Sequence, residues 1–456
     1  MTQEDHEAAA AAMVEATLTQ ENLGELHGRL SRCFARVEPL QQARKYVIGL
    51  MSDLPRKNSW TLAEHAGDRT PDRMQRLLND AVWDTTTAMG VIRRFVAEHL
   101  APPAGELAVA ALDETGQEKK GSSTAGVKRQ YMGCAGQVAN GVNTVHCSYA
   151  TRGGHALIGA RLYLPAEQLD DPDRRTALGI PTDVVFRTKP QLAIDIITDA
   201  LTDQTMPPWC AGDEVYGRSS QLRRHLQDHQ IGYVLRVGCA FTIDLNPVTR
   251  LRADTIAATH LAADRHWQTM TVPGSKGERS YAWAWAGTTS PRHFLLIRRH
   301  HLSGELAYHY CYVPPGRPVT LATLVAVACL RWPVEEDFEF GKDHFGLDHS
   351  QVRRYTALLR HTVLAMAALA VCAVTAAAAA TRHRPPAPLP TRPDQPPPPD
   401  PGLIPLTVAE IKRLFNLITR RHLPEEHHRR WGIWRRRHQA RARWFHHRAR
   451  LQRQTS

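Results

Sequence analysis

The chain has 456 residues, a length that allows about three domains, and 43% of its residues are apolar while 22% are charged. These fractions are typical of globular proteins and exclude collagen-like or largely disordered chains. The net charge is +12, and residues 406–456 hold 14 Lys or Arg against 3 Asp or Glu, which leaves +1 for everything before them. The chain therefore consists of a nearly neutral body followed by a polycation.

The eight cysteines are scattered without a CxxC pair, and the first residues lack the basic and apolar pattern of a signal peptide. We therefore expect a reduced, cytoplasmic protein. Residues 362–380 are long enough to cross a membrane, but about half of them are alanine, which is only weakly apolar. We predict a buried or partner-facing helix there, and no membrane partner.

Residues 1–100 are predicted to form a helical N-terminal domain. A helix near residues 62–67 is followed by a short polar turn, then by Thr70 as N-cap and Pro71 at the first helical position. This pattern fits a DNA-binding helix-turn-helix and an ordinary helical hairpin equally well. In the first case the second helix would read base edges with three side chains, Arg73, Gln75 and Arg76.

Residues 101–237 are predicted to form a mixed α/β layer domain, because strand-like and helix-like stretches alternate there. Two of these stretches end on a carboxylate. The apolar run 107–112 reads as a buried strand that ends on Asp113, and the short segment 209–212 ends on Asp213. The other predicted elements are strands at 131–138, 143–149, 156–164 and 232–237 and helices at 191–201 and 219–229.

The next segments differ in composition. Residues 238–315 alternate with period two and predict a β-rich insertion, in which residues 293–297 and 308–312 form a hairpin. Trp283 or Trp285 could stack on a base there, although such aromatic residues are more often part of the core. The remaining predicted segments are closing helices of the catalytic domain (316–383), a stiff proline-rich linker (384–405) and a basic C-terminal tail (406–456) that opens with an amphipathic stretch at 408–418.

The segment from Arg331 to Lys342 holds the densest charge pattern of the body. On a helix that begins near Pro333, Glu335 and Lys342 share one face. Such a face can supply a metal-binding carboxylate and a cation for a phosphate. The spacing alone is more typical of a solvated charged helix.

Three segments together resemble a known family. They are Leu112–Gly116 with Lys119–Gly121 and Arg129–Tyr131; Gly212–Gly217; and Arg331–Lys342, followed by Gly346–Asp348 and Arg360–His361. Over residues 35–375 the chain is similar to bacterial insertion-sequence transposases of the DDE type, in particular to the insertion-sequence-701 relatives within the insertion-sequence-4 supergroup. Arg331, Glu335 and Lys342 match the supergroup's signature spacing. Its tyrosine position is Ala328, a departure that concerns a phosphate or positioning contact.

The resemblance implies a ribonuclease-H-like fold in which Asp113, Asp213 and Glu335 converge as catalytic residues and metal ligands. Two Mg²⁺ ions about 4 Å apart would activate the attacking oxygen and stabilise the leaving one, with Mn²⁺ as a substitute. The implied activity is cleavage and strand transfer of DNA, with Arg331 and Lys342 on DNA phosphates.

The partners implied are double-stranded DNA, as terminal inverted repeats and as target, and a second copy in a homodimer on DNA. The arginines and tryptophans of the tail indicate a nonspecific DNA grip, and we name Arg435, Arg436 and Arg437 as DNA-binding. An alternative remains open, a catalytically decayed DNA-binding protein or regulator. The three intact carboxylates favour the enzyme, whereas Ala328 favours decay.

Overall fold

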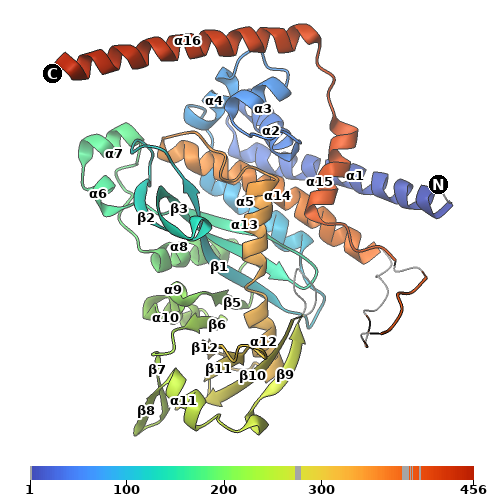
Figure 1. Cartoon of the computed structure of the whole chain (residues 1–456), viewed down its shortest axis with the longest axis vertical. Coiled ribbons are helices and arrows are strands. Elements are labelled where there is room, and N and C mark those ends of the chain that lie inside the picture. Colours follow the sequence, from blue (N-terminus) through green and yellow to red (C-terminus); the bar gives the residue numbers. More distant parts are fainter. Residues whose placement is uncertain are drawn as a thin grey trace.

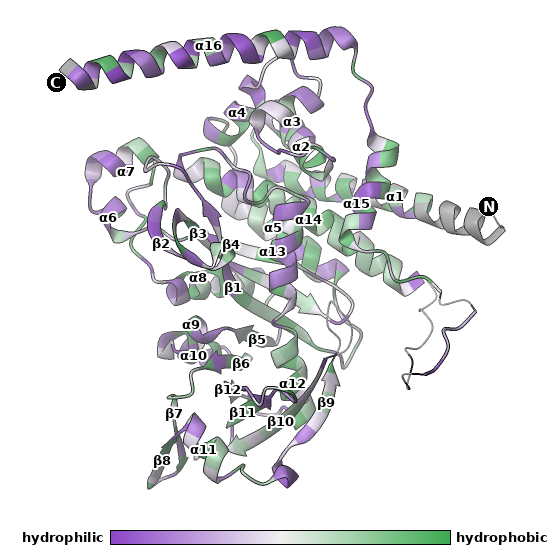
Figure 2. Cartoon of the chain, in the orientation of Figure 1, coloured by the Kyte–Doolittle hydropathy of each residue, from purple (hydrophilic) through white to green (hydrophobic). Residues whose placement is uncertain are grey.

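The computed structural model describes residues 3–272, 279–382, 390, 392, 394–399 and 402–455. Its centre is a ten-stranded mixed sheet, with helices packed against it and a long C-terminal helix that projects from the body (Figure 1). The predicted mixed α/β class is therefore confirmed. Apolar residues gather in the central strands and the helices against them, while the C-terminal helix is mostly hydrophilic (Figure 2).

From residue 3 to residue 99 the chain is mainly helical, as the sequence predicts. The helices are α1 (Gln3–Leu30), α2 (Val37–Met51), α3 (Ser59–His65), α4 (Asp72–Asn79) and α5 (Thr85–His99), with a 3-10 turn at Ser31–Cys33. They share one apolar core with the sheet and with the later helix α14, because one buried cluster contains Leu50 of α2, Leu112 of β1 and Val371 of α14. The N-terminal helices are thus packed onto the rest of the body.

Helices α3 and α4 form the expected pair. Asn58 caps α3 by accepting hydrogen bonds from the N–H groups of Trp60 and Thr61. The prediction of Thr70 as the cap of α4 is wrong, because α4 begins at Asp72 and Pro71 takes the cap position without a side-chain hydrogen bond. All three predicted base-reading residues are exposed on α4: Arg73, Gln75 and Arg76.

The central sheet has the order β2-β3-β1-β5-β6-β12-β11-β10-β9, with β4 also paired to β3. Its first six strands are β1 (Ala108–Glu118), β2 (Lys128–Met132), β3 (Gln137–Thr151), β4 (His155–Leu162), β5 (Trp209–Gly212) and β6 (Gly232–Val237). β1 is antiparallel to β3 and parallel to β5, and β5 is parallel to β6. The predicted strand at 131–138 is two strands, because a 3-10 turn and Gly136 at φ +62° interrupt it.

The β-rich segment is continuous with this sheet. It contains β7 (Thr242–Asn246), β8 (Thr249–Arg252), α11 (Ala253–Thr259), a 3-10 turn (Asp264–His266), β9 (Gln268–Val272), β10 (Arg279–Gly287), β11 (His293–Arg299) and β12 (Leu306–Tyr312). The predicted hairpin is confirmed as β11–β12. β12 also pairs with β6, so β9–β12 extend the sheet and cover an edge that β6 would otherwise expose. β7 and β8 form a separate two-stranded sheet.

The remaining helices of the body are α6 (Ala166–Leu169), α7 (Pro172–Leu178), α8 (Lys189–Thr202), α9 (Glu214–Gly217), α10 (Ser220–Asp228), α12 (Leu321–Cys329), α13 (Pro333–Asp343) and α14 (Tyr355–Arg382). Within the described ranges α14 is the one helix with the length and composition to span a membrane. Of its most apolar window, 78% is buried inside the protein. The prediction of a buried helix is therefore confirmed.

The C-terminal segment contains α15 (Val408–Thr419) and α16 (Glu425–Thr455), and α15 matches the predicted amphipathic stretch. Part of the predicted linker, namely residues 384–389, 391, 393, 400 and 401, lies outside the described residues. α15 packs on α1 and α14. Lys412 Nζ donates to Asp53 at 2.8 Å, and the Asn416 amide donates to the Met51 carbonyl at 2.8 Å.

The first half of α16 docks on the α3–α4 pair. Trp431 is fully buried, and its indole N–H donates to the Asp68 carbonyl in the turn between α3 and α4 at 2.9 Å. His427 Nε2 lies 2.9 Å from the Glu64 carbonyl, and Arg435 pairs with the Glu64 carboxylate. A buried indole and polar contacts therefore fix this half of the basic tail to the body.

Trp431→Ala should destabilise the protein by about 3–5 kcal/mol, the usual cost of truncating a buried Trp. Urea unfolding would measure this loss. Trp444→Ala is the matched control on the same helix, because Trp444 is 59% exposed, and it should change stability by less than about 0.5 kcal/mol. Similar losses for the two variants would contradict the docking.

Candidate active site

Two carboxylates lie close together where the parallel pairing of β1 and β5 ends. Leu112 of β1 lies beside Gly212 of β5, so Asp113 and Asp213 follow their paired residues at the same end of the two strands. The sequence predicts that this strand ends on Asp113. In the structure β1 continues to Glu118, because it stays paired with β3. Asp213 leaves its strand as the N-cap of α9 and accepts the Val215 N–H at 2.9 Å.

The third carboxylate comes from α13, which begins at the predicted Pro333. Its buried residues Val334 and Phe338 hold the helix against the body, and Glu335 lies in the first turn. Arg331 joins this helix to the sheet: its guanidinium donates to Asp113 Oδ2 at 2.9 Å and to Glu335 Oε1 at 2.5 Å. The structure thus brings together two carboxylates from distant parts of the sequence through one arginine.

A fourth carboxylate, Glu114, belongs to the same cluster and is not among the residues predicted from the sequence. It accepts the Tyr216 hydroxyl at 3.0 Å and pairs with Lys189 at 2.5 Å. The sequence signal was its position directly after Asp113. Glu114 therefore ties α8 and α9 to the strand that carries Asp113.

The cluster carries more negative than positive charge. Burial raises the pKa of Asp113 to about 7, with Arg331 opposing the rise and Asp213 adding to it. Burial, followed by the nearby Glu114, also raises the pKa of Asp213. The pKa of Arg331 is raised, because its two carboxylate partners outweigh the effect of burial. Additional positive charge would stabilise the ionised carboxylates.

The donor chemistry fits Mg²⁺, which prefers hard oxygen ligands. Within the described ranges, however, no three Asp, Glu, His or Cys side chains are gathered closely enough to hold one ion together. Asp113 and Glu335 each direct an oxygen to Arg331, which lies between them. The residues therefore fit the metal by type, while Arg331 is their cationic partner in this structure.

A pocket of about 710 Å³ is lined by Arg331, the partner of Asp113 and Glu335, and by Glu336. Two arginines of the pocket stack on aromatic rings: Arg279 lies 4.7 Å from the Trp332 ring centre and Arg298 lies 4.6 Å from that of Tyr281. Such a lining suits a phosphate-bearing strand. Of the two tryptophans that could stack on a base or belong to the core, Trp283 is 2% exposed and packs in a buried cluster, while it also lines this pocket.

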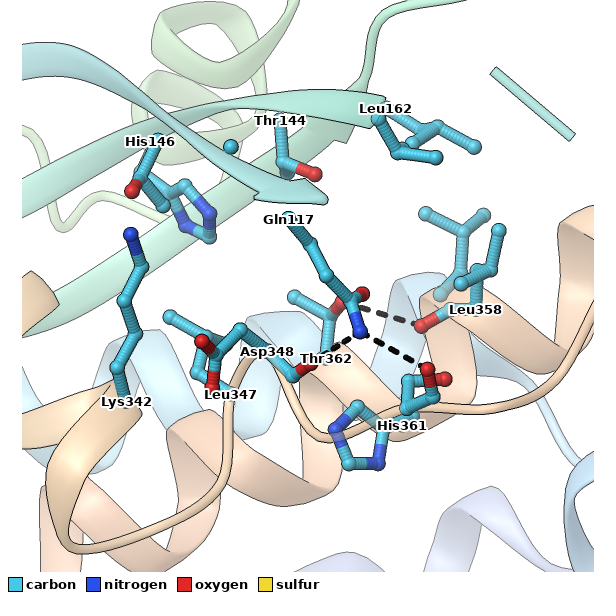
Figure 3. A pocket seen from close by; sticks show the side chains of 15 residues that line it. Gln117, Thr144, His146, Leu162, Lys342, Leu347, Asp348, Leu358, His361 and Thr362 are labelled. Atoms are coloured by element: carbon cyan, nitrogen blue, oxygen red, sulfur yellow. Dashed lines mark hydrogen bonds between the residues drawn. The ribbon is translucent and has the colours of Figure 1, made fainter. Parts of the chain in front are cut away.

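Lys342 lies further along α13 in a smaller pocket of about 30 Å³. Figure 3 shows it opposite His146, a β3 residue whose partner in β1 is Asp113. Gln117 of β1 donates to the carbonyls of Asp348 and Ser350, as the dashed lines in Figure 3 indicate. The loop after α13 is therefore tied to the strand that carries Asp113.

A buried ion pair fixes the opposite side of α13. Asp337 is fully buried and accepts hydrogen bonds from Ser148 of β3 and from His155 of β4, the latter at 2.9 Å. His155 Nε2 also lies 3.3 Å from Glu336. Burial lowers the pKa of His155, but these two carboxylates outweigh it and raise the pKa to about 10. Sequence reasoning missed this anchor, because its members are far apart in the chain.

The sequence matches two family profiles. One, described as "DDE superfamily endonuclease", matches residues 29–271, and the other, "Transposase DDE domain", matches residues 178–371. The first range contains Asp113 and Asp213, and the second contains Asp213 and Glu335.

A curated protein of Microchaete diplosiphon, "Probable transposase for insertion sequence element IS701", is 25% identical to the chain over 257 residues. The matched residues are 55% of this chain and 63% of that protein, so the match spans less than two thirds of the relative's length.

Proposed function

The chain belongs to the DDE superfamily of endonucleases, and we propose that it is an insertion-sequence transposase that cuts and rejoins DNA at the ends of its element. One observation carries this proposal: Asp113 and Glu335 share Arg331, next to Asp213 at the end of the paired strands. The strand order β4-β3-β1-β5-β6, antiparallel at first and then parallel, supports a ribonuclease-H-like catalytic domain.

In this proposal Asp113, Asp213 and Glu335 are the ligands of Mg²⁺, which supplies activation of the attacking oxygen and stabilisation of the leaving one. The chain's own residues position the DNA. The arginines of the 710 Å³ pocket neutralise phosphates, and Lys342 contacts a phosphate from α13. Arg331 joins α13 to the strand that carries Asp113, and Glu114 ties α8 and α9 to the same strand.

DNA recognition is assigned to two elements. The exposed side chains of α4 would read base edges in the terminal inverted repeats, and the basic C-terminal segment would bind phosphates of any sequence. We propose that the protein acts in the cytoplasm as a homodimer on paired DNA ends and on target DNA.

A nicking assay tests the function. The DNA that flanks the gene is incubated with the full chain and Mg²⁺, Mn²⁺ or Ca²⁺. We expect cleavage with Mg²⁺ and Mn²⁺, and binding without turnover in Ca²⁺. Specific binding without cleavage in any metal would instead support the alternative, a decayed transposase that serves as a DNA-binding protein, which Ala328 in the tyrosine position favours.

Neutral replacement of Arg331 or Lys342 should lower the cleavage rate more than DNA affinity. Arg331→Gln removes the partner of Asp113 and Glu335, and Lys342→Gln removes a charge beside the strand that carries Asp113. Single-turnover cleavage and equilibrium binding would be measured for each variant. Arg279→Gln is the control from the pocket, for which we expect similar losses in both quantities.

Equal losses for all three variants would show that Arg331 and Lys342 contribute only general electrostatic attraction.

A further inference from the structure

The second half of α16 extends beyond the helices on which the first half docks. The contacts of the first half lie within residues 427–438, where Trp434 and His438 also pack against Trp60. In Figure 1 the helix passes over α2–α4 and continues away from them. From residue 439 to residue 450 every side chain is exposed except the half-buried Ala442 and Ala449.

The exposed side of α16 has an ordered charge pattern. Residues seven apart, or four apart in alternation with seven, lie along one line of a helix with 3.6 residues per turn. Two arginine stripes follow such lines. The first stripe is Arg429, Arg436, Arg443 and Arg450, and the second is Arg430, Arg437, Arg441 and Arg448.

A line of apolar residues runs between the two arginine stripes, roughly 60° from each at 3.6 residues per turn. Its members are Ile433, Ala440, Trp444 and Leu451. Ile433 is 50% and Trp444 59% exposed. The docked Trp431 lies on the opposite side, roughly 160° away by the same geometry. The face with both stripes therefore points away from the body.

This face matches the dimensions and chemistry of a DNA major groove, which admits one α-helix between two phosphate strands. An apolar line can contact thymine methyl groups while arginines on either side reach the phosphates of both strands. Residues 427–456 contain no Asp or Glu. A second copy of α16 would carry the same charge and would be repelled.

We propose that residues 436–455 of α16 lie in the major groove of duplex DNA next to the segment contacted by α4. This inference deepens the proposed function. It rests on that function only for which DNA sequence the protein binds. Twenty helical residues span about 30 Å, close to one turn of duplex at about 34 Å. Because Trp431 fixes the helix to α3–α4, the two contacts have a set spacing.

The first test compares charge-neutral and charge-preserving variants of the full chain. Arg436→Gln, Arg443→Gln and Arg450→Gln together remove one stripe, and the triple Lys variant is the matched control. On a random duplex the Gln variant should flatten the slope of log affinity against log salt by about 2 to 3 units, at about 0.9 per phosphate contact. The Lys variant should keep the slope. Equal slopes for wild type and the Gln variant would overturn the proposal.

The second test locates the contact. A chain that stops after His438 keeps the docked residues, and it should lose about 10 base pairs of protection at one end of its footprint, one turn of duplex. Methylation of guanine N7 in that stretch should weaken DNA binding by the full chain but not by the truncated chain. An insertion of four glycines after Gln439 should make the boundary of the protected stretch less distinct. If residues 440–455 were a freely tethered polycation, the same insertion would leave the footprint unchanged.

Two results would overturn the inference. The first is a footprint that does not change after truncation at His438. The second is a triple Gln variant that loses self-association in sedimentation but keeps the salt slope of the wild type. The second result would assign α16 to a second copy of the chain. Absence of cleavage by the wild type, with the salt slopes as expected, would instead contradict the transposase proposal alone.

Discussion

Replacement of Asp113 or Asp213 by Asn, or of Glu335 by Gln, is expected to lower metal-dependent cleavage by at least roughly 10³-fold, because a lost metal ligand removes several kcal/mol of transition-state stabilisation. DNA affinity and folding should change little, since each substitution preserves side-chain volume. Single-turnover cleavage of the flanking DNA, together with binding in Ca²⁺, measures the two effects separately.

Glu339→Gln is the matched control for this prediction. Glu339 lies one turn after Glu335 on the same helix and is exposed, so its variant should cleave like the wild type. If any one of the three carboxylate variants keeps wild-type cleavage, that residue is not a metal ligand.

Asp337→Ala should cost about 3–5 kcal/mol of stability, since removal of one partner of a buried ion pair leaves an uncompensated charge. The charge left behind is that of His155, which would keep Glu336 as its only carboxylate partner. Urea unfolding at pH 6 gives the difference, and Asp343→Ala, an exposed position on the same helix, is the control. A loss below about 1 kcal/mol would mean that the pair does not hold α13.

The same pair predicts a pH dependence of stability. The pKa of His155 is about 10 in the folded protein and about 6.5 when unfolded, so its contribution is complete below pH 6.5 and is lost as the pH rises through 10. The unfolding free energies of wild type and His155→Gln should therefore differ most near pH 6 and converge towards pH 10. A constant difference across this range would contradict the ion pair.

The local elements of the fold could be predicted from the sequence, because their signals are local. Pro333 marks the start of α13, and the period-two stretch at 293–312 indicates the hairpin. The two apolar runs also predict the buried strands β1 and β5, whereas the convergence of Asp113 and Asp213 with each other is implied only by the family resemblance. The resemblance to a known family supplied the third carboxylate.

The remaining features depend on contacts between distant segments. Nothing near Arg331 shows that its partners are Asp113 and Glu335 instead of DNA, and nothing near Asp337 points to His155. The docking of α16 was equally hidden, because composition marks residues 406–456 as a basic tail. Only the fold reveals that Trp431 has a buried acceptor in the turn after α3.

The separation between Trp431 and Asp68, 363 residues, also bears on how the protein matures. Contacts between such distant residues form late, because chain entropy opposes them until the intervening segments have folded. During translation α3 and α4 emerge long before the indole that completes their turn. If α4 and α16 bind DNA as proposed, a ribosome-bound chain carries an incomplete DNA-recognition unit, and any product that stops before α16 would be a weak competitor for the same DNA sites.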